Sequence, residues 1–217
     1  MAAAPNLTSD ILLNLLKDGV RELGLSCSQD ALARLIQYQE LLAKWNKAYN
    51  LTAVIVPEQM VRLHLLDSLV VSTHLSGFNI LDVGTGAGLP GIPLALINPD
   101  KEFFLLDSNA KKTRFVQQAK MEIELQNITV VRSRLEEFHS EIKFETIISR
   151  AFSDLASFVY GTRHLLQRDG VMVAMKARLS KEEINQIAEF ETRVEPVYVP
   201  GIDVERNLVL VSATRIK

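Results

Sequence analysis

The stretch ILDVGTGAGLPG, residues 80–91, decides the fold of this chain. A short apolar segment ends in the carboxylate of Asp82. Glycines then follow at every second position, as Gly84, Gly86 and Gly88, before a Leu-Pro-Gly step. A backbone of this kind lets a ligand approach main-chain N–H groups that no side chain shields. We therefore expect a strand, a ligand-binding loop and the start of a helix, with an adenine-containing cofactor as the ligand.

The pattern after residue 79 alternates short apolar runs with amphipathic stretches, which predicts an α/β fold. We expect a Rossmann-like arrangement, in which helices cover both faces of a mostly parallel seven-stranded sheet. The last two strands, separated by Pro200 and Gly201, form an antiparallel edge. Strands are expected at 80–83, 102–106, 128–131, 146–148, 171–175, 194–199 and 208–212, and helices at 89–97, 111–125, 156–166 and 181–190.

The first part of the chain has a different pattern, with apolar residues at helical spacing from Asp10 to about Leu75. A helix is expected to begin near Ser28, and a third helix near Pro57. We therefore divide the chain into a helical extension at 1–75, packed on the core, and a cofactor-binding domain at 76–217.

Composition describes an ordinary globular protein. The 217 residues are 47% hydrophobic and 23% charged, with a formal net charge of -2, which argues against a surface coated in positive charge. We expect no membrane span and no signal peptide. Cys27 is the single cysteine, so an internal disulfide and a cysteine-rich metal site are excluded. These features predict a cytoplasmic protein.

Two cofactors compete for the glycine loop. Residues 86–91 match the G-x-G-x-x-G pattern of dinucleotide sites, and Asp107 follows at the end of the next predicted strand. An oxidoreductase that uses NAD(P) is therefore one interpretation. Asp82, however, suits the amino group of S-adenosylmethionine, directly or through water, and would repel a pyrophosphate. Asp107 accepts ribose hydroxyls in either case. We favour a methyltransferase, because the residues after Asp107 are used up by the sheet.

The sequence also limits the methyl acceptor. The loop after the fourth strand reads Ser-Arg-Ala-Phe at residues 149–152, not the Asn/Asp-Pro-Pro-aromatic motif of many exocyclic-amine methyltransferases. Cys27 lies far upstream, where it cannot serve cytosine C5 methylation. An acceptor with a free lone pair, such as guanine N7, requires no general base.

The chain resembles the RsmG family, once called glucose-inhibited division protein B, from about Leu32 to Arg206. These bacterial enzymes have the class I methyltransferase fold and methylate N7 of one guanine in 16S ribosomal RNA. The motifs that carry the resemblance lie at residues 45–52 (WNKAYNLT), 66–68 (LDS), 82–93 (DVGTGAGLPGIP), 106–108 (LDS), 133–137 (SRLEE) and 149–151 (SRA).

The resemblance implies S-adenosylmethionine as cofactor. As partner it implies 16S rRNA or a small-subunit ribosomal particle, bound by a monomer without membrane or metal. It places Gly84 and Leu89 at the cofactor, Leu135 and Glu136 beside the adenine, and Asp107 at the ribose. Arg150 is implied as a cofactor-pocket residue that also faces the RNA, and Lys176 as a second catalytic candidate. A non-catalytic RNA-associated factor built on this fold is the remaining alternative.

Several conspicuous residues have simpler interpretations. We expect Trp45 to anchor the core and His64 to make a structural hydrogen bond. Asp67 is expected to pair with Arg62 or to face solvent. Lys111, Lys112 and Arg114, which open a helix, form a solvated face close enough to the cofactor to meet phosphates. Histidines at ligand-like spacing are missing from the sequence, so we expect no metal site.

Overall fold

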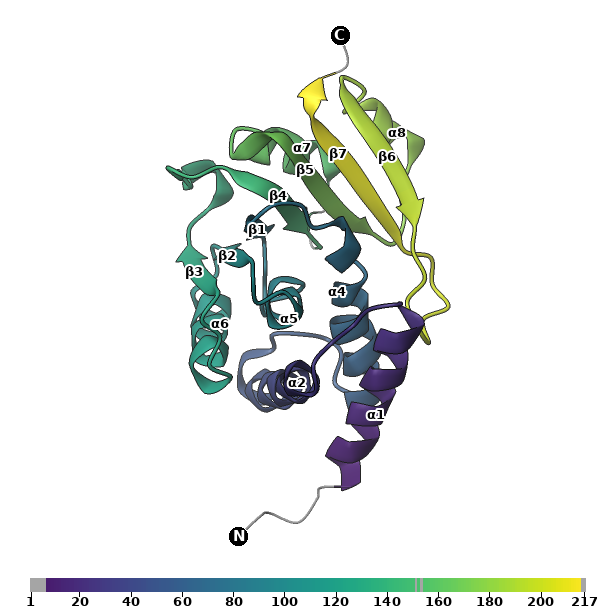
Figure 1. The fold of residues 1–217 in the computed structure, drawn as a ribbon. Coiled ribbons are helices and arrows are strands. Elements are labelled where there is room, and N and C mark those ends of the chain that lie inside the picture. The colour runs from purple at the N-terminus through teal and green to yellow at the C-terminus, as the bar shows by residue number, and fades with distance from the viewer. Residues whose placement is uncertain (1–6, 151, 153, 216–217) are drawn as a thin grey trace.

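The computed structural model describes residues 7–150, 152 and 154–215. They form a seven-stranded sheet in the order β3-β2-β1-β4-β5-β7-β6, with helices on both faces (Figure 1). Strand β7 runs antiparallel to β5 and to β6, and the other neighbouring strands are parallel to each other. The strands are β1 (Asn79–Val83), β2 (Glu102–Asp107), β3 (Ile128–Arg132), β4 (Phe144–Ser149), β5 (Leu166–Lys176), β6 (Phe190–Pro196) and β7 (Asn207–Arg215).

Two hydrophobic clusters cover the two faces of the sheet, because side chains alternate along each strand. Ile80 packs on one face and Leu81 on the other. The first face carries α1 (Leu7–Glu22), α2 (Gln29–Tyr49), α3 (Pro57–Met60), α4 (Asp67–Leu69), the 3₁₀ turn η2 (Ser72–His74), α5 (Gly91–Ile97) and α6 (Ala110–Glu122). The second carries the 3₁₀ turn η3 (Leu135–Glu137), α7 (Leu155–Thr162) and α8 (Lys181–Asn185).

The predicted architecture is confirmed, and the differences lie at element boundaries. The helix expected at 181–190 ends at Asn185, and Phe190 already belongs to β6, so its second half was wrong. The buried ring of Phe190 packs with the sheet, because tertiary burial outweighs a short helical pattern. The third N-terminal helix is interrupted by a π-helical turn, η1 (Val61–Leu66), which its sequence does not announce.

The sheet order reverses between β1 and β4, since the chain proceeds from β1 to β3 on one side and continues with β4 on the other. Ligands of open α/β sheets bind at the carboxyl ends of the strands beside such a reversal. Ser149 Oγ at the end of β4 donates to the Val83 carbonyl at the end of β1, at 2.8 Å. The two strand ends that should flank a ligand are therefore tied together.

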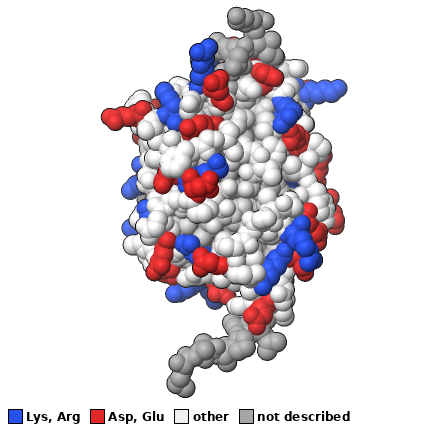
Figure 2. All heavy atoms as spheres, viewed as in Figure 1, with Lys and Arg blue, Asp and Glu red and all other residues white. Residues whose placement is uncertain are grey.

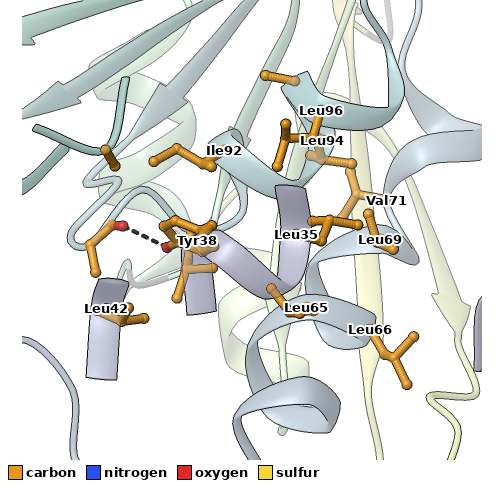
Figure 3. Packing of buried hydrophobic residues seen from close by; sticks show 14 of the residues in the cluster. Leu35, Tyr38, Leu42, Leu65, Leu66, Leu69, Val71, Ile92, Leu94 and Leu96 are labelled. Atoms are coloured by element: carbon orange, nitrogen blue, oxygen red, sulfur yellow. Dashed lines mark hydrogen bonds between the residues drawn. The ribbon is translucent and has the colours of Figure 1, made fainter. Parts of the chain in front are cut away.

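The N-terminal helices reach the glycine loop directly. Tyr38 of α2 is completely buried, and its hydroxyl donates a 2.7 Å hydrogen bond to the carbonyl of Ala87 (Figure 3). Leu35 and Leu42, about one turn to either side, pack in the same cluster as Ile92 of α5. Helix α2 thus holds the glycine loop from the side of the first hydrophobic cluster.

This contact predicts that Tyr38→Phe lowers the free energy of unfolding by about 1–3 kcal/mol, because it leaves the buried Ala87 carbonyl without its donor. Urea unfolding at pH 7 measures the change. Tyr198→Phe is the matched control, since Tyr198 is 64% exposed and should behave as wild type. Equal stability of the two variants would show that the Tyr38 hydroxyl does not brace the loop.

Candidate active site

Asp82 fixes both ends of the glycine loop. Its Oδ2 accepts hydrogen bonds from Thr85 Oγ1 at 2.6 Å and from the backbone N–H of Gly91, at the start of α5, at 2.8 Å. A Cβ at Gly91 would lie 2.7 Å from that same oxygen, so the close approach of this backbone requires glycine. The carboxylate therefore sets the path of the chain from the strand into the helix.

Asp82 is fully buried, and burial raises its pKa to about 6 despite the hydrogen bonds from Thr85 and Gly91. Its other oxygen, Oδ1, has no hydrogen-bond partner among the described residues. A buried acceptor of this kind is costly unless something donates to it. Asp82 thus retains one acceptor for a donor from outside the protein, directly or through water.

Asp107, the last residue of β2, supports the loop from the other side. Its Oδ2 accepts from the N–H of Gly86 at 2.9 Å, and its Oδ1 from the N–H of Asn109 at 2.8 Å. A carboxylate offers about four acceptor positions, so it can accept further bonds from a ligand. Asp107 lies on a pocket of about 300 Å³ that is lined by Val83, Gly84, Leu106, Asp107, Ser108, Ser133, Arg134, Leu135, Glu136 and Phe152.

The glycines of the loop have different roles. Gly84 has φ +71° and would meet nothing within 4 Å if it carried a Cβ, so its bare backbone opens to the pocket. A Cβ at Gly88 would instead lie 2.4 Å from Ile92. Gly86 is bonded to Asp107, and Lys112 Nζ lies 4.0 Å from the position of a Cβ there. Gly84 thus lines the pocket with bare backbone, whereas the absence of a side chain at Gly88 permits close packing against Ile92.

The structure brings Gly84, Asp107, Leu135 and Glu136, which the family resemblance assigns to the cofactor, together around this pocket. Asp82, Gly88 and Leu89 lie buried behind it and shape the loop without lining the pocket. These residues fit a ligand with amino and hydroxyl donors, because they offer an orphan acceptor, a strand-end carboxylate and an unshielded backbone. S-adenosylmethionine has these groups.

Arg150 and Lys176 line a second pocket, of about 310 Å³, together with Val54, Leu63, His64, Asp67, Met175, Ala177 and Arg206. Arg150 directly follows β4, and its Nη1 donates to the Leu63 carbonyl at 3.2 Å. Lys176 ends β5, with its Nζ 2.6 Å from Oε1 of Glu183, which also forms the capping box of α8. Arg150 does not line the first pocket, where the sequence also placed it.

The expected environment of Asp67 was wrong. Its side chain is 7% exposed and lies 2.9 Å from Nε of Arg206 and 3.6 Å from Nη1 of Arg150. Arg62 instead lies against Gly201, where a Cβ would collide with its guanidinium. The π-helical turn η1 precedes Asp67 and sets its direction, and such turns occur frequently at functional sites. The contact between Arg206 and Asp67 was not predictable from the sequence, because the two residues are 139 positions apart and no local pattern marks Arg206.

Asn46 of the Trp-Asn-Lys motif is connected to the second pocket through Thr52 and His64. Asn46 donates to the Thr52 carbonyl at 3.0 Å and accepts from its N–H at 2.8 Å, which fixes the turn after α2. Thr52 Oγ1 lies 2.8 Å from Nε2 of His64, as the structural interpretation of this histidine predicted. Trp45 packs on the core and against Phe115, which confirms its anchoring role.

Burial and the neighbouring charge of Arg150 lower the pKa of His64 to about 4. The imidazole is therefore neutral at pH 7 and makes no charged contact in the pocket. In the described part of the chain, His, Cys, Asp and Glu side chains form no group of three or more suited to a metal ion. None of the described helices combines the length and apolar character needed to cross a membrane.

The fold is that of the methyltransferases. A putative O-methyltransferase from Klebsiella pneumoniae aligns with a TM-score of 0.55 at 12% identity, covering 81% of this chain and 89% of that chain. The N-methyltransferase NodS from Bradyrhizobium japonicum WM9, solved with S-adenosyl-l-homocysteine, aligns with a TM-score of 0.53 at 16% identity, covering 81% and 97%. The architecture and the loop thus define a class I methyltransferase fold.

Sequence similarity is more specific. The GidB family model, described as rRNA small subunit methyltransferase G, matches residues 31–209. A ribosomal RNA small subunit methyltransferase G of Methylobacillus flagellatus is 48% identical over 91% of this chain and 97% of its own length. The protein of the same name from Nitrosospira multiformis is 46% identical over 90% of this chain and 94% of its own length. The chain belongs to the rRNA small subunit methyltransferase G family, as the resemblance predicted.

The low pKa of His64 predicts a pH-dependent loss of stability. The unfolded state binds a proton near pH 6.5, whereas the folded state does so only near pH 4, so unfolding is favoured as the pH falls between these values. From pH 7 to 5, wild type should lose about 2 kcal/mol more than His64→Gln, which cannot titrate. Urea unfolding at both pH values tests this. Parallel losses in the two proteins would show that His64 titrates normally.

Proposed function

We propose that this protein transfers a methyl group from S-adenosyl-L-methionine to N7 of one guanine in bacterial 16S ribosomal RNA. Family membership supports the reaction and the substrate class. The observation that carries the proposal is the pair of pockets on the two sides of the β1 and β4 ends. One holds an open glycine backbone and a carboxylate, and the other holds arginines.

The first pocket is proposed to bind the cofactor. Gly84 offers unshielded backbone, Asp107 accepts the ribose hydroxyls, and Leu135 and Glu136 lie beside the adenine. Asp82 holds the loop, and its buried Oδ1 is proposed to reach the amino group through water. When bound there, S-adenosylmethionine supplies an electrophilic methyl group on its sulfonium.

The second pocket is proposed to receive the guanine, extruded from the RNA. N7 carries a lone pair and no proton, so the pocket has to position the base without deprotonating it. Arg150, which lines this second pocket, orients the acceptor. Lys176 is proposed to act as a cation and not as a base. Its ammonium group is held in place by the ion pair with Glu183. His64, neutral and bonded to Thr52, shapes the wall.

We further propose that the protein works in the cytoplasm as a monomer, where it meets 16S rRNA or a partly assembled small-subunit particle. Residues 1–75 would act as a helical extension that braces the cofactor-binding domain at 76–217. The contact between Tyr38 and the glycine loop supports this division of roles.

Mass mapping of methylated nucleotides in 16S rRNA, from cells with and without this protein, tests the proposal. One 7-methylguanosine should disappear when the gene is deleted and return when purified protein and S-adenosylmethionine are added to small subunits from the deletion strain. An unchanged methylation pattern would contradict it. Calorimetric titration with NADH covers the oxidoreductase alternative, which requires binding of that dinucleotide.

The open backbone of Gly84 predicts the effect of a single methyl group. Gly84→Ala should weaken S-adenosylmethionine binding at least tenfold, because the Cβ points into the pocket, and should cost about 1 kcal/mol of stability through its positive φ. Gly24→Ala is a matched control, since Gly24 has φ +67° and a Cβ there would also meet nothing within 4 Å, far from the site. Calorimetry distinguishes the two variants. Equal cofactor affinity would place the cofactor elsewhere.

A further inference from the structure

We infer that Arg206 and Arg150 form a clamp for an RNA phosphate in the second pocket, and that Asp67 is the residue that positions both guanidinium groups. The inference rests on the proposed function for the identity of the ligand, and it adds Arg206 to the residues that contact the substrate. The residues come from three separate segments, α4, the end of β4 and the start of β7.

The geometry of the three side chains is well defined. Asp67 Oδ1 accepts from Nε of Arg206 at 2.9 Å, and Oδ2 lies 3.6 Å from Nη1 of Arg150. The carboxylate is nearly buried, with 7% of its side chain exposed, whereas 20% of Arg206 and 25% of Arg150 are exposed. All three side chains line the pocket, and the two cations are more exposed than the acid between them.

The charges in this group do not cancel. One carboxylate is shared by two guanidinium groups, so Asp67, Arg150 and Arg206 together carry a net charge of +1. His64 is neutral, Lys176 is paired with Glu183, and the Asp82 carboxylate offsets only part of the Arg150 charge. A partly buried positive charge that is not fully compensated attracts an anion more strongly than an exposed one does. The ligand class that this pocket favours is therefore an oxyanion.

Both arginines retain donors for such a ligand. Each guanidinium has five N–H donors. Arg206 uses Nε for Asp67 and Nη1 for the Glu205 carbonyl at 3.2 Å, and Arg150 uses Nη1 for the Leu63 carbonyl. Within the described residues, Nη2 of each side chain makes no further hydrogen bond. Planar guanidinium groups bind phosphate oxygens through two parallel hydrogen bonds.

An RNA phosphodiester is the oxyanion that fits the proposed substrate. A nucleotide extruded into the pocket brings its own phosphate to the rim, while Val54, Leu63 and Met175 give the apolar surface that a base requires. On the face shown in Figure 2, both signs of charge are interspersed, so that face supplies little competing attraction for RNA. The carboxylate of the cofactor is the other possible source of an oxyanion, and it gives a different result in the test.

The test measures binding of unmodified small-subunit rRNA, from cells that lack this protein, across a series of salt concentrations. Arg206→Ala should weaken RNA binding and reduce the slope of log K against log[salt] by about 0.7–0.9, the value for one phosphate contact. Its affinity for S-adenosylmethionine should match wild type. Arg21→Ala removes the same charge from a side chain that is 79% exposed on α1, and should leave the slope unchanged.

Two further variants distinguish positioning from charge. Arg206→Lys keeps the cation but loses the planar contact with Asp67, so it should keep most of the salt slope and lose turnover. Asp67→Asn removes a negative charge, so it should bind RNA at least as tightly as wild type and show a lower kcat with little change in KM. A variant of Asp67 with normal kcat would show that the carboxylate positions nothing.

The clamp is overturned if Arg206→Ala has the wild-type salt slope. It is also overturned if that variant loses cofactor affinity and keeps RNA affinity, because the oxyanion is then the cofactor carboxylate. Failure of the proposed function has a different signature, since wild-type protein would then neither bind nor methylate small-subunit rRNA. If Arg206→Ala does not fold, the salt slope and turnover of Arg206→Lys test the clamp instead.

Discussion

The structure depends on one buried carboxylate. Asp82 Oδ2 bonds to Thr85 and to the N–H of Gly91, so a single oxygen joins the end of β1, the loop and the start of α5. Charge-assisted hydrogen bonds of this kind contribute about 1.5–3 kcal/mol each. Burial raises the pKa of Asp82 from 3.8 to about 6, so the contribution of this group to folding stability is lost as the pH rises from about 3.8 to about 6. The geometry of the loop offsets that cost.

Two pockets with different chemistry lie at the carboxyl ends of the strands, one beside the loop that Asp82 holds and one beside Asp67. Asp107 and Tyr38 brace the loop from two other directions, so the backbone of Gly84 stays open without collapsing. On the other side of the β1 and β4 ends, Asp67 holds two arginines toward the second pocket. Carboxylates therefore organise both pockets, one by bonding to the backbone and the other by bonding to cations.

Much of this was predictable from local sequence. The glycine loop, Asp82 and Asp107 stand out because their chemistry is confined to a strand end and a turn, and the strand periodicity gives the sheet. The contacts of Asp67 were not predictable, because they join segments 139 residues apart and follow a π-helical turn that no propensity announces. The end of α8 was missed for a related reason, since burial of Phe190 in the sheet outweighs its helical spacing.

Family membership and geometry contribute different parts of the account. Membership identifies a methyltransferase of small-subunit ribosomal RNA, while the coordinates assign residues to each pocket. The family resemblance placed Arg150 at the cofactor, and the structure places it on the neighbouring pocket, beside Asp67. The cofactor and the guanine are therefore assigned to two different pockets.

A crystal structure of this protein with S-adenosyl-L-homocysteine distinguishes the two pockets. The ligand should lie along the backbone of Gly84, with its ribose on Asp107 and its adenine beside Leu135, while the pocket of Asp67 and Arg206 stays open. A ligand seated between Arg150 and Arg206, or displaced from Gly84, would overturn the assignment of the cofactor to the first pocket.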